Sequence, residues 1–200
     1  MNDNLTANPD RFIGIAIHNK GPMEVSAYNT WQRATAKIAS FPKGSVDRAD
    51  AAGRESWTST ITRNLSNVTK LGFAIDAKEE NEILTLDVYI GYNGVIVENT
   101  KLTVVLTEYD VPQSTPNAQS VYQTSGSNNL SPLPKNCQHS HVLRGIITTA
   151  ISGDSIQLNS QVGYTKVSLT AVDLNSYGIL ENQGFTLLLL CTLIHLQRIY

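Results

Sequence analysis

Leu84-Thr85-Leu86-Asp87-Val88-Tyr89-Ile90 is the stretch of sequence that decides the fold. Its apolar residues fall at every second position, which is typical of an antiparallel strand with one buried face. Residues 102–107 repeat the pattern, with leucines and valine on one face and Thr103, Val105 and Thr107 on the other. Asn93-Gly94 lies between the two segments and is a signal for a hairpin turn. We therefore predict neighbouring antiparallel strands in this part of the chain.

Further short strands are predicted on both sides of this pair. They are Leu71–Ala77, Val142–Ile151 and Thr165–Leu174, and turn residues such as Gly153-Asp154 separate them. Several short strands with regular turns favour a β-sandwich over residues 70–200. The stretch between Tyr109 and Cys137 is rich in Ser, Asn, Pro, Gln and Gly and is predicted to be a long loop.

The first part of the chain, residues 1–69, has a different pattern. Apolar residues recur there at spacings of three and four, which indicates amphipathic helices, and one short apolar run indicates a buried strand. The expected elements are a strand at Phe12–His18, a helix at Glu24–Ser40, an extended piece at Ser45–Arg48 and a helix at Ala49–Asn64. The fold class predicted for the whole chain is thus mixed α+β.

The composition favours an extracellular module over a cytosolic helical enzyme. Charged residues make up 16% of the 200 residues, below the typical value of about 25%. The net charge of −2 gives no basic surface for nucleic acid. The polar start Met1–Asn4 shows no signal peptide. The apolar tail Phe185–Leu196 is too short to cross a bilayer as a helix.

The two cysteines, Cys137 and Cys191, are far apart and have no CxxC spacing. They are predicted either to form a single disulfide or to be two inert thiols.

Four segments, in this order, resemble a known family. They are Phe12–His18, Phe41–Arg48, Thr103–Asp110 and His139–Gly145. Together they are similar to the twenty-eight-kilodalton outer-membrane protein family of Bacteroidetes. Members of that family join a thioredoxin-like domain to a C-terminal β-sandwich, are exported, often as lipoproteins, and have been proposed as surface receptors or adhesins. The resemblance implies that residues 1–69 are a truncated thioredoxin-like segment.

The resemblance also gives Pro42 a role. In thioredoxin-like folds, a proline before a strand is held in the cis form opposite the redox cysteines, so Phe41-Pro42 is expected to be cis. The cysteine pair would lie upstream of Phe12, where this sequence has none. A thiol-disulfide oxidoreductase that has lost its redox pair is therefore the alternative function.

Each candidate chemical group also has an ordinary structural explanation, which we favour. His139 and His141 are spaced like metal ligands, but two ligands alone bind a metal poorly. His18 has Ser26 or Asp47 as conceivable partners, without any nucleophile motif. The carboxylates at 79, 80 and 82 are expected in a solvated turn. We predict no catalytic residue, no cofactor site and no metal site.

The function predicted from the sequence is a non-catalytic binding or adhesion protein of the outer membrane or cell surface. The polar segment Tyr109–Leu133 is the preferred contact region, because loops on rigid scaffolds carry function. The ligand is a protein or surface molecule of unknown identity and not a nucleic acid. Membrane association is expected only through an N-terminal anchor that this sequence lacks. An uncovered sheet edge and the apolar tail predict a homodimer or aggregation, unless the tail closes the sandwich.

Overall fold

The computed structural model describes residues 2–8, 11–49, 51–67, 71–94, 100–112, 120–122, 130–132, 138–158, 162–178 and 185–193. Its helices are α1 (Asn2–Ala7), α2 (Ser26–Thr35), η1 (Arg54–Ser56), α3 (Trp57–Leu65) and η2 (Leu174–Tyr177). Its longer strands are β1 (Leu71–Glu80), β2 (Ile83–Tyr92), β3 (Thr100–Glu108), β8 (Val142–Ile146), β10 (Gly163–Asp173) and β11 (Phe185–Leu193). Its short strands are β4 (Val111–Pro112), β5 (Ser120–Tyr122), β6 (Leu130–Pro132), β7 (Gln138–His139) and β9 (Asp154–Ser155).

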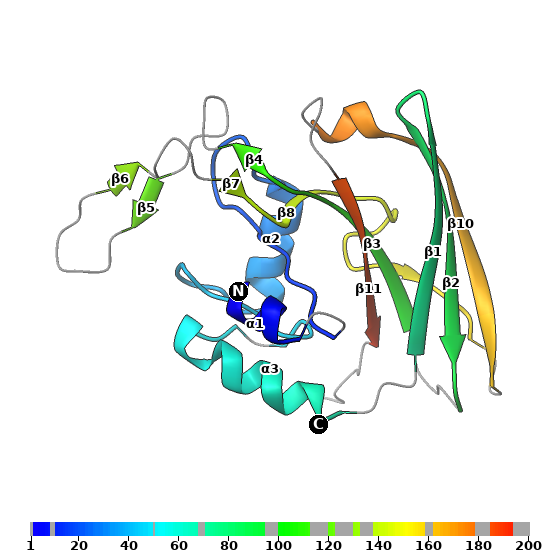
Figure 1. Ribbon diagram of the computed structural model, residues 1–200, viewed down its shortest axis with the longest axis horizontal. Coiled ribbons are helices and arrows are strands. Elements are labelled where there is room, and N and C mark those ends of the chain that lie inside the picture. Colours follow the sequence, from blue (N-terminus) through cyan, green and yellow to red (C-terminus); the bar gives the residue numbers. More distant parts are fainter. Residues whose placement is uncertain are drawn as a thin grey trace.

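Two antiparallel sheets dominate the structure (Figure 1). One has the strand order β1-β2-β10, and the other has the order β11-β3-β8 with β9 beside β3. The small pairs β4-β7 and β5-β6 are also antiparallel. The mixed α+β class with antiparallel sheets is therefore confirmed.

The main hydrophobic core lies between the two large sheets. The alternation in β2 and β3 places their apolar residues on the facing sides, so that side chains of both strands join one cluster. Its buried members are Leu71, Leu84, Leu86, Val88, Ile90, Tyr92, Leu102, Val104, Leu106 and Leu174. Full burial of each leucine, isoleucine or valine contributes about 1.5–3 kcal/mol to folding. The periodicity of residues 84–90 thus predicted the buried face correctly.

Strand β3 is buried on both faces, which its alternating pattern did not predict. Val105, on the side away from the main core, packs with Tyr28 of α2 and Leu143 of β8 in a second cluster. Helix α2 therefore covers the outer side of the β11-β3-β8 sheet, and the molecule has three layers (Figure 1). The middle layer, the β11-β3-β8 sheet, is buried on both sides because helix α2 covers one side and the β1-β2-β10 sheet covers the other.

The predicted hairpin between β2 and β3 is wrong. The two strands belong to different sheets, and β2 pairs with β1 and β10 instead. The hairpin forms one strand earlier, between β1 and β2, where Asn81 and Glu82 have φ angles of 52° and 64°. Two residues with positive φ fit the turn type preferred in tight hairpins. Burial of the apolar faces of β2 and β3 against each other overrides the local signal at Asn93-Gly94.

The expected strand Phe12–His18 is reduced to a single parallel bridge between Ala16 and Val142. The Ala16 amide donates to the His141 carbonyl at 2.7 Å, and the Leu143 amide donates to the Ala16 carbonyl at 3.0 Å. The apolar run lies beside β8 without a full ladder of hydrogen bonds. Its residues Ile15 and Ile17 pack against the second cluster.

The predicted helices are present but shorter. Helix Glu24–Ser40 is confirmed as α2, and helix Ala49–Asn64 starts only at η1 and continues as α3. The extended piece Ser45–Arg48 is wrong, since Asp47 and Arg48 have φ angles of 51° and 58° and form a turn. The cis Phe41-Pro42 bond expected from the resemblance is confirmed.

At the C-terminal side, Val142–Ile151 is a strand only as far as Ile146. The carboxylate of Asp154 accepts hydrogen bonds from the amides of Thr149 and Ala150, which closes a turn at this point. The strand at Thr165–Leu174 is confirmed as β10, with Leu174 opening η2. The apolar tail forms β11 against β3, which is one of the two outcomes expected for it.

Candidate functional site

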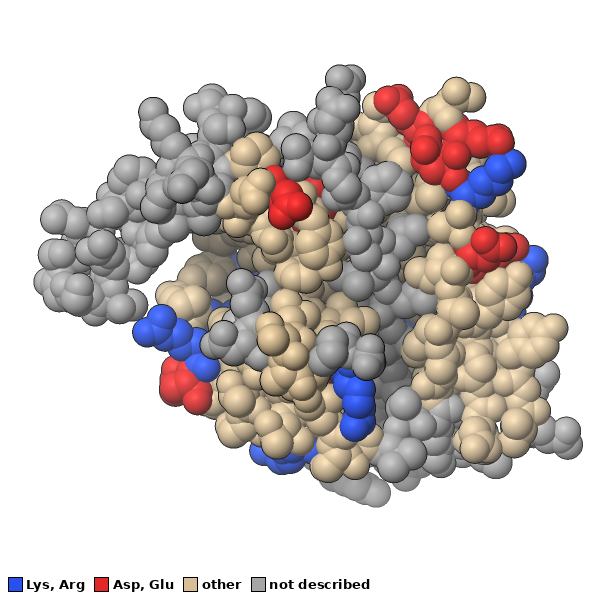
Figure 2. Space-filling view, in the orientation of Figure 1, with Lys and Arg blue, Asp and Glu red and all other residues tan. Residues whose placement is uncertain are grey.

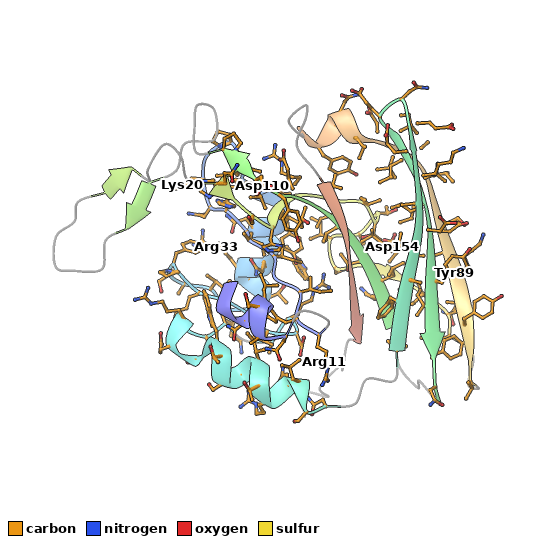
Figure 3. The ribbon with its side chains drawn as sticks, in the orientation of Figure 1. Arg11, Lys20, Arg33, Tyr89, Asp110 and Asp154 are labelled. Carbon is orange, nitrogen blue, oxygen red and sulfur yellow. The ribbon has the colours of Figure 1, made fainter. Side chains whose placement is uncertain are left out.

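The exposed side of the β1-β2-β10 sheet brings together residues that the sequence places far apart. Because Leu84 to Ile90 point inward at alternate positions, the residues between them point outward. The strand register then sets three rows across the sheet. We define the outer face by these rows, Gly72/Gly91/Tyr164, Ala74/Tyr89/Lys166 and Asp76/Asp87/Ser168. In Figure 3, Tyr89 lies on the side of the sheet that faces away from the helices.

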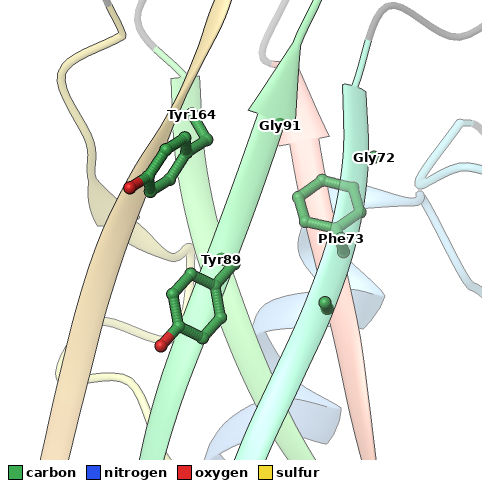
Figure 4. A pocket seen from close by; sticks show the side chains of 6 residues that line it. Gly72, Phe73, Tyr89, Gly91 and Tyr164 are labelled. Carbon is green, nitrogen blue, oxygen red and sulfur yellow. The ribbon is translucent and has the colours of Figure 1, made fainter.

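A shallow hollow of about 490 Å³ lies on this part of the sheet, and we call it the aromatic hollow (Figure 4). It is lined by Gly72, Phe73, Ala74, Tyr89, Gly91 and Tyr164. Tyr164 is 71% exposed. A side chain this exposed gains little of the free energy that burial would give it, so folding alone does not require an aromatic residue here.

Two glycines form the floor of the aromatic hollow, and packing does not require either. A Cβ atom added to Gly72 would meet nothing within 4 Å, and one added to Gly91 would meet only the Gly72 carbonyl at 3.9 Å. Neither residue has a φ angle that favours glycine. A Cβ atom would fit at either position and would stand in the hollow.

Polar groups border the aromatic hollow in the next row. The carboxylate of Asp87 accepts hydrogen bonds from the Ser168 hydroxyl and from the Lys166 ammonium, the latter at 3.1 Å. The hydrogen bond from Ser168, and after it the one from Lys166, lower the pKa of Asp87 below its usual 3.8. The same contact raises the pKa of Lys166. Both groups are therefore charged at neutral pH, beside Tyr89.

The two histidines whose spacing resembles that of metal ligands, His139 and His141, contact different rings. The His139 ring makes an edge-on contact with His18 at 5.4 Å between centroids, and the His141 ring contacts Tyr109 at 4.4 Å. Burial lowers the pKa of His139 and His141 and raises that of Tyr109. Within the described ranges, no three His, Cys, Asp or Glu side chains gather as a metal site.

The other singled-out residues lie in ordinary structural settings or outside the described residues. Asp47 accepts a hydrogen bond from Asn64 at 2.8 Å, and Ser26 starts α2. Cys137 and most of Tyr109–Leu133 lie outside the described residues. Cys191 lies in β11, where only the backbone is described.

The carboxylates at 79, 80 and 82 form the solvated turn that was predicted. Glu79 accepts a hydrogen bond from the Glu82 amide at 2.8 Å, and Glu80 pairs with Lys78 at 2.8 Å. Glu82 accepts one from Asn175 at 2.6 Å, which ties the turn to η2. Figure 2 shows acidic side chains gathered at this end of the sheet.

The model of the family Omp28, outer membrane protein, matches residues 29–175. The chain belongs to the Omp28 family. The match spans most of helix α2, the aromatic hollow and the strands β1, β2, β3, β8 and β10. The chain is thereby an outer membrane protein, as expected from the resemblance. No curated protein and no solved structure matches it. Among the described residues, no helix has the length and apolar character needed to cross a membrane.

Within this Omp28 chain, two of the segments that carried the resemblance, Thr103–Asp110 and His139–Gly145, contact each other. Glu108 of β3 and Arg144 of β8 form an ion pair at 3.2 Å, with side chains 0% and 8% exposed. The Arg144 guanidinium also donates to the Gly178 carbonyl after η2. Sequence reasoning missed this pair, because nothing in either segment alone shows that the strands are adjacent.

The aromatic hollow was also missed, although one signal for it existed. The alternation in residues 84–90 places Tyr89 on the face opposite the core, two positions before Gly91. Tyr164 is found only from the pairing of β10 with β2. Without knowledge of the strand order, nothing in the sequence of this Omp28 chain relates Tyr89 to Tyr164.

Proposed function

We propose that the chain is a non-catalytic binding protein at the surface of the outer membrane, and that the outer face of the β1-β2-β10 sheet is its binding face. The observation that carries the proposal is the aromatic hollow, in which Tyr89 and the exposed Tyr164 stand over a glycine floor beside an ionised Asp87. Membership of the outer membrane family supports the location.

The physical setting of the outer face suits binding. Its residues lie on three hydrogen-bonded strands whose inner sides pack in the main core, so the side chains start from a rigid support. A rigid site loses little conformational freedom on binding, which improves affinity. Apolar surface with a few placed polar groups is the usual composition of ligand sites.

We further propose a division of the chain near residue 69, into a thioredoxin-like segment and a β-sandwich over residues 70–200. The core shared by β2 and β3 supports the sandwich, because it joins two antiparallel sheets face to face. Thiol-disulfide exchange, the alternative function, needs an attacking thiolate and a resolving cysteine. Residues 1–69 contain no cysteine, and the two at 137 and 191 lack the CxxC spacing.

Surface labelling on intact cells of the native host tests the proposed function. A membrane-impermeant amine reagent is applied before and after lysis, and labelled peptides are identified by mass spectrometry. Lys166 of the outer face and Lys78, which follows Asp76 by two positions on β1, are expected to be labelled on intact cells. Lys101, which is partly buried and hydrogen-bonded to Ser152, is the internal control for reactivity. Labelling of Lys78 and Lys166 only after lysis would remove the proposal.

A further inference from the structure

We propose that the aromatic hollow binds a neutral pyranose sugar, as part of a surface or extracellular glycan. This inference rests on the proposed function, because it names the ligand class of the same outer face. Four features of the site carry it: the placement of the tyrosines, the floor, the polar border and the charge.

The tyrosines are placed to contact one sugar ring. Tyr164 lies directly opposite Gly91, and Tyr89 lies two positions from Gly91 on the same strand, so the tyrosines are diagonal neighbours across β2 and β10. Diagonal neighbours are about 7–8 Å apart between Cα atoms. A pyranose ring presents C–H groups on its faces, and these stack against the π face of an aromatic side chain. The side chains of Tyr89 and Tyr164 stand beside each other at the hollow (Figure 4).

The floor fits a ring-sized ligand. The shallow hollow has a volume of about 490 Å³, which leaves room for a sugar ring to rest on the strands. Gly72 and Gly91 leave the strands without side chains at the point where a ring would rest, although a Cβ at Gly72 would meet nothing. Because the fold does not need these glycines, the open space is the property that they supply.

The polar border supplies hydrogen bonds for sugar hydroxyls. The ionised Asp87 is an acceptor and Lys166 is a donor, whereas the Ser168 hydroxyl gives its one hydrogen to Asp87 and offers only its oxygen as an acceptor. All three lie in the two rows next to Gly91. Hydrogen bonds to charged groups are roughly twice as strong as those between neutral groups. A polyol both donates and accepts, so it can use both kinds of group.

The charge of the outer face selects a neutral sugar. Asp76 lies directly opposite Asp87, so two carboxylates stand in one row with Lys166 as the nearby cation. Uronic acids, sulfated sugars and nucleic acid phosphates would meet like charge there. A protein partner fits the site less well, since hot spots of protein interfaces fill well-packed pockets, whereas this hollow is shallow.

The experiment uses the full chain and an array of neutral, sulfated and uronic-acid oligosaccharides, followed by calorimetric titration of the neutral sugars that bind. Tyr164→Ala is expected to weaken binding about tenfold or more, the order expected from losing one aromatic stacking partner. Tyr164→Phe retains the ring and is expected to bind within about threefold of the unmodified chain.

Gly72→Val is the most informative variant. Valine favours strands, and an added Cβ at this position meets nothing within 4 Å, so the unfolding midpoint is expected to stay or rise while sugar binding is lost. Thr85→Ala, on the same sheet face nearer the β1-β2 turn, is the matched control and should bind normally. A folded Gly72→Val variant that binds neutral sugar as well as the unmodified chain would overturn the proposal.

The remaining outcomes separate this inference from the proposed function. Binding to no sugar, or only to anionic sugars, overturns the carbohydrate assignment, and labelling of Lys166 on intact cells would still support the surface binding face. Capture of an extended peptide that Gly72→Val leaves unaffected would place the ligand at the β1 edge of the sheet and also overturn the assignment. Labelling only after lysis, with a sugar bound in vitro, would remove the surface role and keep the sugar site.

Discussion

The buried pair between Glu108 and Arg144 makes the sharpest prediction about stability. The Nε and Oε2 atoms are 3.2 Å apart, which corresponds to an attraction of about 5 kcal/mol at an effective dielectric constant of about 20. Desolvation of both groups offsets much of this attraction. Glu108→Met leaves the guanidinium buried without its carboxylate, and Arg144→Met leaves the carboxylate buried without its cation. Each single change is expected to lower the free energy of unfolding by about 3–5 kcal/mol.

The double variant Glu108→Met/Arg144→Met should cost much less than the sum of the single changes. It leaves no buried charge behind, and replacement of a buried pair by apolar residues is often neutral. Loss of the hydrogen bond from Arg144 to the Gly178 carbonyl leaves a residual cost of about 1–2 kcal/mol. The expected coupling between the two sites is therefore several kcal/mol, well above the limit of about 0.5 kcal/mol for independent sites.

Urea unfolding of the four proteins, followed by circular dichroism and by the fluorescence of Trp31 and Trp57, measures the coupling. The slope with urea must stay constant for the free energies to be compared. Effects of the single changes that add within about 0.5 kcal/mol would show that the two side chains do not act as a buried pair, and the reasoning would be refuted.

Three other predictions concern packing, pH and assembly. Gly145→Ala is expected to destabilise the fold by about 1–3 kcal/mol, because the added Cβ would lie 2.0 Å from Cδ1 of Tyr177. Calorimetry should show a lower unfolding midpoint, which a second change of Tyr177→Ser largely restores. An unchanged midpoint in Gly145→Ala would count against this prediction. Burial lowers the pKa of His139 and His141 below 6.5, so the unfolded chain binds more protons and the free energy of unfolding should fall as pH drops below about 6.5. The variant His139→Gln/His141→Asn should lose this dependence between pH 7.5 and 5.5 in urea titrations, and an unchanged dependence would contradict the assignment. Among the described strands, β1 is the last of its sheet, and a strand at the edge of a sheet favours pairing between chains. Light scattering at micromolar concentration should therefore give more than the monomer mass of 21.9 kDa, whereas a monomer mass at all concentrations would oppose the prediction.

The sequence predicts elements better than it predicts their neighbours. The alternation in residues 84–90 identified β2 and its buried face, because period two follows directly from strand geometry. The predicted pairing of β2 with β3 was wrong, because Asn93-Gly94 is a local signal while burial between sheets is a long-range effect. The alternation predicts a half-exposed Val105, whereas in the structure this residue packs against Tyr28 of α2.

The candidate site shows the same limit. Tyr89 is identifiable as an outward residue from β2 alone, but its role depends on Tyr164 and on the glycines of two other strand positions. The spacing of His139 and His141 in the sequence fits that of metal ligands. Their contacts are with His18 and Tyr109, and only the fold specifies those.

The pairing of β2 with β10 has a consequence for how the molecule folds. Lys166 and Asp87 are 79 residues apart in the chain, whereas β1 and β2 are joined by a tight turn. A hairpin forms in about 1–10 μs, but strand pairs that close long loops are slow to form. The β1-β2 hairpin is therefore expected early and the addition of β10 late, and until then one edge of β2 is open to other chains. The outer face, with Tyr164 and Lys166, is absent from every intermediate in which β10 is still unpaired, so the proposed binding face is complete only after β10 has paired.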